Sequence, residues 1–119
     1  MVDTININTA EHYTWGNICD GWHLLKTPGL SIIQERVPPH ASETRHSHQV
    51  AQQFFYILSG TATFEYEGET LMLRAGDGIH VPPGIVHQFR NESEDDVFFL
   101  VISQPPSHGD RINTEVFSK

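Results

Sequence analysis

Three histidines in this chain have the type and spacing needed to hold a metal ion. His46 and His48 are separated by one residue, and His87 follows 39 residues after His48 in a stretch rich in Pro and Gly. Side chains on a β-strand alternate between its two faces, so His46 and His48 would point to the same side. A third imidazole from a distant segment can join them only if the sheet curls back on itself. The spacing therefore predicts both a metal site and a closed β-structure.

The segments that must position these histidines read as short strands between turn residues. The apolar period is two or less, and long amphipathic helical stretches are absent. Turn signals recur about every 8–12 residues, which is typical of an all-β sandwich or barrel. We expect one domain over residues 1–119, with a barrel core at about 30–103, an N-terminal arm at 1–29 and a C-terminal tail at 104–119. The expected strands cover residues 30–37, 46–50, 52–58, 61–67, 70–73, 79–81, 86–90 and 97–103, with one further candidate at 113–117.

The spacing around His87 resembles a signature motif of the cupin superfamily. That motif reads G-x5-P-x-G-x2-H-x3-N, and the chain contains all five of its fixed residues. They are Gly76, Pro82, Gly84, His87 and Asn91.

The other cupin signature, G-x5-H-x-H-x3,4-E-x6-G, is matched in part. His46, His48 and Gly60 fit, whereas His40 stands at the first Gly position and Gln53 at the Glu position. Because glycine there would allow a positive φ, His40 leads us to expect an ordinary extended turn.

The resemblance implies an antiparallel jelly-roll barrel with a divalent metal ion inside. Carried over residue by residue, the ligands would be His46, His48, His87 and Gln53. An amide is neutral, so this ligand set leaves the charge of the ion uncompensated and favours a small anionic co-ligand. Gln53 could instead hydrogen-bond to the bound ligand. Imidazole and amide ligands leave Fe, Mn, Zn and Ni open as the metal.

Strand alternation also predicts what lines the pocket beside the ion. If Gln53 points inward, Phe55 and Ile57 follow on the same face, and Phe89 shares the face of His87. We therefore expect a largely apolar and aromatic substrate pocket with these three residues in its wall.

The opposite face of residues 52–58 carries Phe54, Tyr56 and Leu58. A small barrel can hardly cover this apolar face by itself. We expect a homodimer or a larger assembly.

Composition excludes several kinds of partner. The formal net charge of −8 argues against nucleic acid and against anionic membrane surfaces. No apolar run approaches the ~20 residues that span a bilayer, and no signal peptide is visible. Cys19 is the only cysteine, so no intramolecular disulfide can form, and we expect a cytoplasmic protein.

Two classes of function remain open from the sequence. One is an enzyme that uses the metal ion, either of dioxygenase type or a lyase or isomerase that stabilises an enolate. The other is a binding or sensing module without turnover, because a fold alone does not fix function. The strands of the pocket show no evident second carboxylate, which counts against the enzyme. For Glu43 and Arg45, beside the His pair, we expect an ion pair of structural character.

Overall fold

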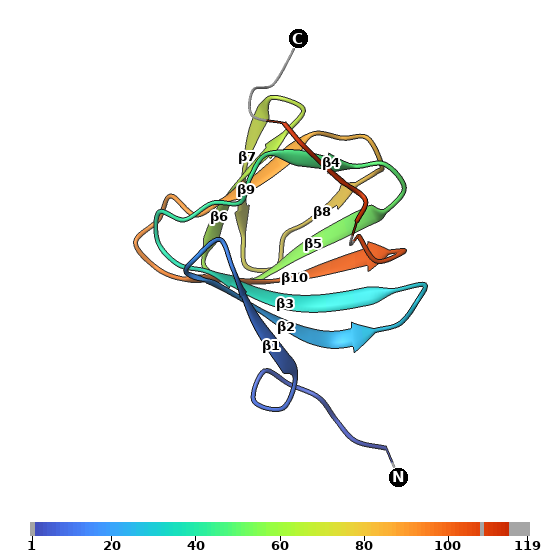
Figure 1. Ribbon diagram of the computed structural model, residues 1–119. Helices are drawn as coiled ribbons and strands as arrows, with labels where there is room; N and C mark the ends of the chain where they lie inside the picture. Colours follow the sequence, from blue (N-terminus) through green and yellow to red (C-terminus); the bar gives the residue numbers. More distant parts are fainter. Residues whose placement is uncertain (1, 108, 115–119) are drawn as a thin grey trace.

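Antiparallel strands make up the regular structure of this protein. The computed structural model describes residues 2–107 and 109–114, and within these ranges it contains strands and no helix (Figure 1). The strands are β1 (Glu11–Trp15), β2 (Cys19–Lys26), β3 (Ser31–Val37), β4 (His46–His48), β5 (Gln52–Ser59), β6 (Thr61–Tyr66), β7 (Glu69–Arg74), β8 (Gly78–Val81), β9 (His87–Arg90), β10 (Val97–Gln104) and β11 (Arg111–Asn113).

The strands form two sheets that face each other and enclose the core (Figure 1). The larger sheet has the order β1-β2-β3-β10-β5-β8, and the smaller has the order β11-β4-β9-β6-β7. Strands distant in sequence are therefore neighbours, as when β10 lies between β3 and β5. This arrangement confirms the predicted all-β antiparallel jelly-roll barrel.

Strand β5 shows the expected alternation between the two sides of the barrel wall. Gln53, Phe55 and Ile57 are buried, whereas Phe54 and Tyr56 are each 39% exposed. The inward residues join an aromatic core in which Phe89 and Phe99 stack with ring centroids 4.0 Å apart. The core therefore packs directly behind the strand that carries Gln53.

A two-residue turn joins β6 to β7. Tyr66 pairs with Glu69, which leaves Glu67 and Gly68 as the loop. Both have positive φ, 49° and 83°, as the type I′ turn of a tight hairpin requires. Glu67-Gly68 therefore forms the tight turn of this hairpin.

The turn at His40 differs from the expectation. We expected an ordinary extended turn, but His40 has a φ of 65° and so keeps the left-handed conformation of the motif's glycine. Its backbone N–H donates to Asn91 O at 2.7 Å, which holds the reversed chain in place. Histidine is among the residues that enter this region more readily than most, and its exposed side chain contacts Glu94 at 2.6 Å.

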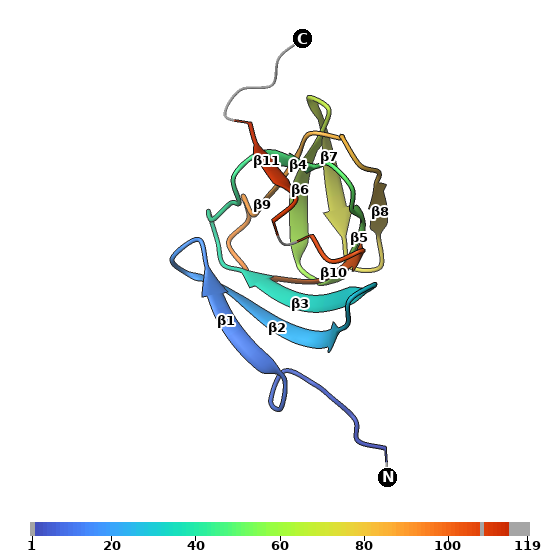
Figure 2. The ribbon, with the colours of Figure 1, turned by 45° about the vertical axis from the view of Figure 1, so that its right-hand side comes forward.

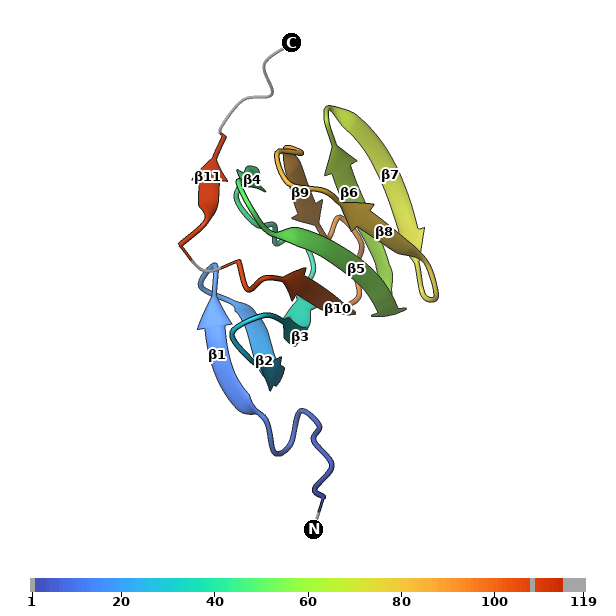
Figure 3. The same cartoon turned by 90° about the vertical axis from the view of Figure 1, so that its right-hand side faces the viewer.

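The chain ends contribute more to the sheets than we expected. The predicted N-terminal arm contains β1 and β2, which extend the larger sheet beyond the barrel (Figure 1). At Gly21, a Cβ atom would lie 2.3 Å from the Tyr13 ring, so the glycine makes room for this tyrosine. The candidate strand at 113–117 begins earlier, as β11, which lies beside β4 (Figure 2 and Figure 3). Residues 115–117 of that prediction lie outside the described residues.

None of the described segments forms a helix capable of crossing a bilayer.

Candidate metal centre

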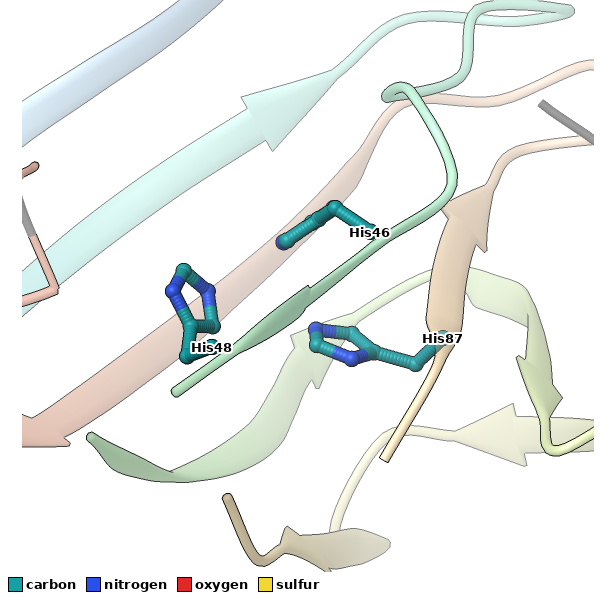
Figure 4. Close-up of side chains that lie close together, drawn as sticks. All are labelled: His46, His48 and His87. Carbon is teal, nitrogen blue, oxygen red and sulfur yellow. The ribbon is translucent and has the colours of Figure 1, made fainter. Parts of the chain in front are cut away.

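His46, His48 and His87 come together inside the barrel. Their ligand nitrogens all lie within 4.8 Å of one another. His46 and His48 project from one side of β4, and His87 projects from the neighbouring β9, where it is the pairing partner of His46. The three rings point toward a common space (Figure 4). The sheet closure that the spacing demanded is therefore present, and the three histidines could bind a metal ion.

Backbone carbonyls orient two of the three rings. His46 Nδ1 lies 2.6 Å from Thr44 O, and His87 Nδ1 lies 2.9 Å from Ile85 O. A carbonyl only accepts, so the proton of each neutral ring is at Nδ1 and Nε2 keeps its lone pair for a cation. A hydrogen bond of this kind is the usual way a protein fixes a metal-binding imidazole.

Aromatic side chains of the core also hold the His87 ring in place. Phe64 stacks against it with ring centroids 5.8 Å apart and planes 11° apart, and Phe55 meets it edge-on at 5.8 Å. The position of His87 is therefore set by packing as well as by the Ile85 carbonyl.

Several buried polar atoms at this centre have no protein partner, which fits a bound metal ion. Within the described residues, Nδ1 and Nε2 of His48, Nε2 of His87 and Oε1 of Gln53 make no hydrogen bond. Burial lowers the pKa of His46 to about 3, with His87 adding to the effect, and lowers the pKa of His87 to about 4. Burial also lowers the pKa of His48. The imidazoles are therefore neutral at pH 7, as ligands must be.

Gln53 lies at the same centre on the facing sheet. Its side chain is buried, and Nε2 donates to Ser103 Oγ at 3.0 Å. With the amide nitrogen on Ser103, Oε1 is the atom that has no partner among the described residues. The role of Gln53 as a ligand stays a prediction that this orientation favours.

A cavity of about 250 Å³ opens beside His46, His48 and Gln53. Of the predicted pocket residues, Phe55 lies in its wall. Ile57 and Phe89 are instead fully buried in the core and are absent from the wall. They support the cavity from behind, and their contact with a substrate stays a prediction.

The cavity wall is far more polar than expected. We expected a largely apolar and aromatic lining, but Glu35, Glu43 and Arg111 line the cavity together with serine residues. The expectation considered only the strands that carry the three histidines and Gln53. The polar groups come from β3, from the loop before β4 and from β11.

Two glutamates are the main site residues that sequence reasoning missed. Glu43 Oε1 accepts the backbone N–H of Phe89 at 2.9 Å. It is not the ion-pair partner of Arg45, whose guanidinium instead pairs with both oxygens of Glu65. Glu35 faces the same cavity from β3. The alternation of β3, with buried Ile33 and Val37 on the same face, could have indicated this inward-facing charge.

Burial shifts both carboxyl groups toward neutral pH. It raises the pKa of Glu35 to about 7, although the Tyr13 hydroxyl and the charge of Arg111 oppose the shift. It raises the pKa of Glu43 to about 8, and the nearby Glu35 adds to the rise. The Tyr13 hydroxyl donates to Glu35 Oε2 at 3.1 Å, so β1 helps to position this group.

Comparisons with known proteins agree with this architecture. The family model described as "Cupin domain" matches residues 33–103. The chain is 30% identical over 90 residues to "Polyketide synthase CurC" of Streptomyces cyaneus, covering 73% of this chain and 56% of that protein. It is 38% identical over 68 residues to "Quercetin 2,3-dioxygenase" of Bacillus subtilis, covering 56% of this chain and 20% of that protein. The chain thus spans little more than half of the first relative and a fifth of the second.

A solved structure shows the same fold over nearly the whole chain. The polyketide cyclase RemF from Streptomyces resistomycificus superimposes with a TM-score of 0.84 at 18% identity. The match covers 98% of this chain and 87% of the RemF chain, so β1, β2 and β11 lie within the shared architecture.

Proposed function

This chain belongs to the cupin family, and on that premise we propose that it is a metal-dependent enzyme of acid–base type. It holds a small oxygen-bearing anion beside a divalent ion and moves a proton on that ligand. The observation that carries the proposal is that Glu35 and Glu43, with pKa values of about 7 and 8, share one cavity with His46 and His48.

The ion would be held by His46, His48 and His87, with Gln53 facing it from β5. Fe, Mn, Zn and Ni all suit such a set. When bound, the ion supplies Lewis-acid polarisation of a ligand oxygen.

The two glutamates are suited to proton transfer. A general acid or base works best when its pKa lies near the operating pH. One oxygen of each is held by the protein, Glu43 Oε1 by Phe89 N–H and Glu35 Oε2 by the Tyr13 hydroxyl. Among the described residues the second oxygen of each makes no hydrogen bond, so it can accept a proton from a ligand.

The likeness to the Streptomyces cyaneus protein supports a carbon acid as the ligand. A polyketide chain carries carbonyl groups on alternate carbons, and the hydrogens between them are acidic. Removing such a hydrogen is a reaction that a carboxylate of near-neutral pKa performs beside a Lewis acid.

Solvent exchange tests this proposal directly. The metal content of the purified protein is measured first, and acetylacetone and pyruvate are then incubated in D2O with the zinc-loaded protein. NMR should show deuterium entering the carbon beside the carbonyl faster than with zinc alone. We expect Glu43→Gln or Glu35→Gln to slow this exchange about 10²-fold or more, whereas the exposed Glu69→Gln leaves it unchanged. Equal exchange in all four proteins would contradict the assignment.

The likeness to quercetin 2,3-dioxygenase favours a second candidate, an oxygen-using enzyme. The same protein loaded with Fe(II) would then consume O₂ in the presence of 1,3-diketones or catechols. Oxygen uptake without solvent exchange would favour this second function. Tight ligand binding with neither reaction would favour a binding module.

A further inference from the structure

Arg111 is the only Lys or Arg side chain in the wall of the cavity, among the described residues. It lies on β11, which pairs with β4 so that Arg111 is opposite His48 and Asn113 is opposite His46. Directly opposed residues of an antiparallel pair project to the same face of the sheet. The register therefore places this guanidinium on the side of β4 that carries the two histidines.

Neutral atoms, and no carboxylate, hold the guanidinium. Arg111 Nε donates to Asn113 Oδ1 at 2.9 Å, and Nη2 donates to Thr44 O at 3.3 Å. Within the described residues Arg111 forms no salt bridge, and its Nη1 makes no hydrogen bond. Arg36, Arg45 and Arg90, by contrast, each pair with a carboxylate. Arg111 thus keeps a free charge-assisted donor at the cavity, which is the group that recognises a carboxylate best.

The backbone at the start of β11 is anchored beside the segment that follows β4. The Asp110 carboxylate accepts the backbone N–H groups of Gln49, Val50 and Ala51, at distances of 2.8 to 3.1 Å. This carboxylate ties the residue before Arg111 to the segment that follows His48. The backbone at Arg111 is therefore tied to the strand that carries His46 and His48, and its exposed side chain borders the cavity.

The charges at the cavity leave room for one more anion. A divalent ion on three neutral imidazoles, together with Arg111, contributes three positive charges. Of the residues that line the cavity, Glu35 and Glu43 contribute at most two negative charges, so the lining and the ion together keep at least one positive charge even when both are ionised. The Asp110 carboxylate lies outside the lining and accepts the backbone N–H groups of residues 49–51. The cavity volume of about 250 Å³ suits a small ligand.

We propose that Arg111 is the carboxylate anchor of this site and that it selects small monocarboxylates carrying a second oxygen for the metal ion, such as 2-oxo acids. This inference rests on the proposed metal site and deepens it by naming the ligand class. In this arrangement the carboxylate of the ligand faces Arg111, and its oxo group faces the histidines.

Binding of a charged and an uncharged probe tests the inference. Pyruvate and its neutral isostere pyruvamide are titrated calorimetrically into the zinc-loaded protein, and zinc content is measured for each variant. We expect Arg111→Gln to weaken pyruvate binding about 10- to 100-fold and to change pyruvamide binding less than about twofold. Arg111→Lys keeps the positive charge but loses the forked pair of N–H donors, so its affinity for pyruvate should lie between those of the wild type and Arg111→Gln. The exposed Arg74→Gln makes the same charge change away from the cavity and should bind as the wild type does.

The outcomes separate this inference from the proposed function. Equal pyruvate binding by wild type and Arg111→Gln, or an equal loss for pyruvamide, would overturn the role of Arg111 and leave the metal site standing. Failure of the zinc-loaded wild type to bind pyruvate would overturn the ligand class. A wild type that retains no zinc would overturn the proposed function, and the same titrations on metal-free protein would then decide whether Arg111 binds the carboxylate.

Discussion

The three histidines of the candidate metal centre differ in how much each also contributes to holding the fold. His46 and His87 each donate Nδ1–H to a backbone carbonyl, so they also tie down the chain at Thr44 and Ile85. His48 makes no hydrogen bond through either ring nitrogen within the described residues. Its polar atoms are buried without compensation, which suits a residue whose purpose is to bind a ligand rather than to hold the fold.

We therefore expect His48→Ala to lose metal binding while the metal-free protein stays folded. No hydrogen bond is lost, and the side chain borders an open cavity, so the free energy of unfolding should change by less than about 1 kcal/mol. Metal analysis after dialysis and urea unfolding of the metal-free protein measure the two effects. The exposed His80→Ala is the control. A variant that keeps its metal would show that His48 is not a ligand.

Because Gln53 is uncharged, replacing it with glutamate should change the affinities for the metal ion and for an anionic ligand in opposite directions. Gln53→Glu adds a negative charge at the centre, so it should tighten the metal about tenfold or more and weaken anionic ligands. Chelator competition measures the metal, and pyruvate titration measures the ligand. An unchanged metal affinity would show that Oε1 of Gln53 does not contact the ion.

At the scale of elements, β1 supplies part of the cavity wall and β2 makes room for it. Tyr13 and Trp15 line the cavity from β1, and the Tyr13 ring crosses over Gly21 of β2. The position of the Tyr13 hydroxyl on Glu35 therefore depends on the absence of a side chain at residue 21. A glycine in a strand has a defined structural use here, as a site of close approach.

Gly21→Ala should displace Tyr13 and disturb the wall that holds Glu35. The added Cβ would lie 2.3 Å from the ring, and overpacking of this kind costs about 1–3 kcal/mol. Thermal unfolding and the fluorescence of the neighbouring Trp15 measure the change. Gly29→Ala is the matched control, because a Cβ there meets nothing within 4 Å. Equal behaviour of the two variants would contradict the proposed packing.

The strands between residues 30 and 103 could be predicted because their apolar alternation is interrupted by clear turn residues. The β6–β7 hairpin is an example, since Glu67-Gly68 separates two alternating runs. The strands β1 and β2 could not be recognised in this way. Residues 11–26 mix charged, aromatic and small side chains, and their pairing depends on packing against β3. The turn at His40 was misread because tertiary contacts hold a non-glycine residue at positive φ.

At the scale of the whole molecule, the two glutamates of the cavity wall make stability depend on pH. Their folded pKa values, about 7 and 8, exceed the ordinary value of 4.5, so the folded state binds more protons than the unfolded state between these limits. The contribution of these two groups to the free energy of unfolding is therefore fully present below pH 4.5, and it is lost as the pH rises through 7 and 8. The histidines act in the opposite direction, but only below their ordinary value of 6.5.

Above pH 6.5 only the effect of the glutamates remains. We expect the free energy of unfolding of the metal-free protein to fall by roughly 2–2.5 kcal/mol between pH 6.5 and pH 8. Glu43→Gln should flatten most of this slope, because Gln can still accept the Phe89 N–H and cannot ionise. Urea unfolding at several pH values in the presence of a chelator measures this free energy for both proteins. A stability that rises over this range would show that Glu43 is ionised in the folded protein.

The outer face of β5 supports the proposed homodimer. Phe54, Tyr56 and Leu58 lie on this face and are each partly exposed. If they form the interface, light scattering should return twice the monomer mass of 13.5 kDa, and Tyr56→Lys should reduce it toward one monomer. A wild-type mass of one monomer would contradict this arrangement.

The candidate site could be predicted only where a local spacing encodes it. His46, His48 and His87 follow from strand alternation and a motif, and the structure brings them together. Glu35, Glu43, Tyr13 and Arg111 lie on segments far apart in the chain and meet only after both sheets have closed. Their grouping depends on the register of β1, β3 and β11, which the alternation of single strands does not reveal.

The match of the family model starts after β2 and ends before β11, and the three histidines of the candidate metal centre all lie inside it. Tyr13, Trp15 and Arg111 are consequently contributed by segments outside the family match, and these segments reach the cavity from either side of it in the sequence. Exchanging these terminal segments between members of the family should transfer the choice of small molecule while the metal stays the same. Differences in ligand preference among such barrels would then come from the segments that flank the family match, and the identity of the metal from the segment inside it.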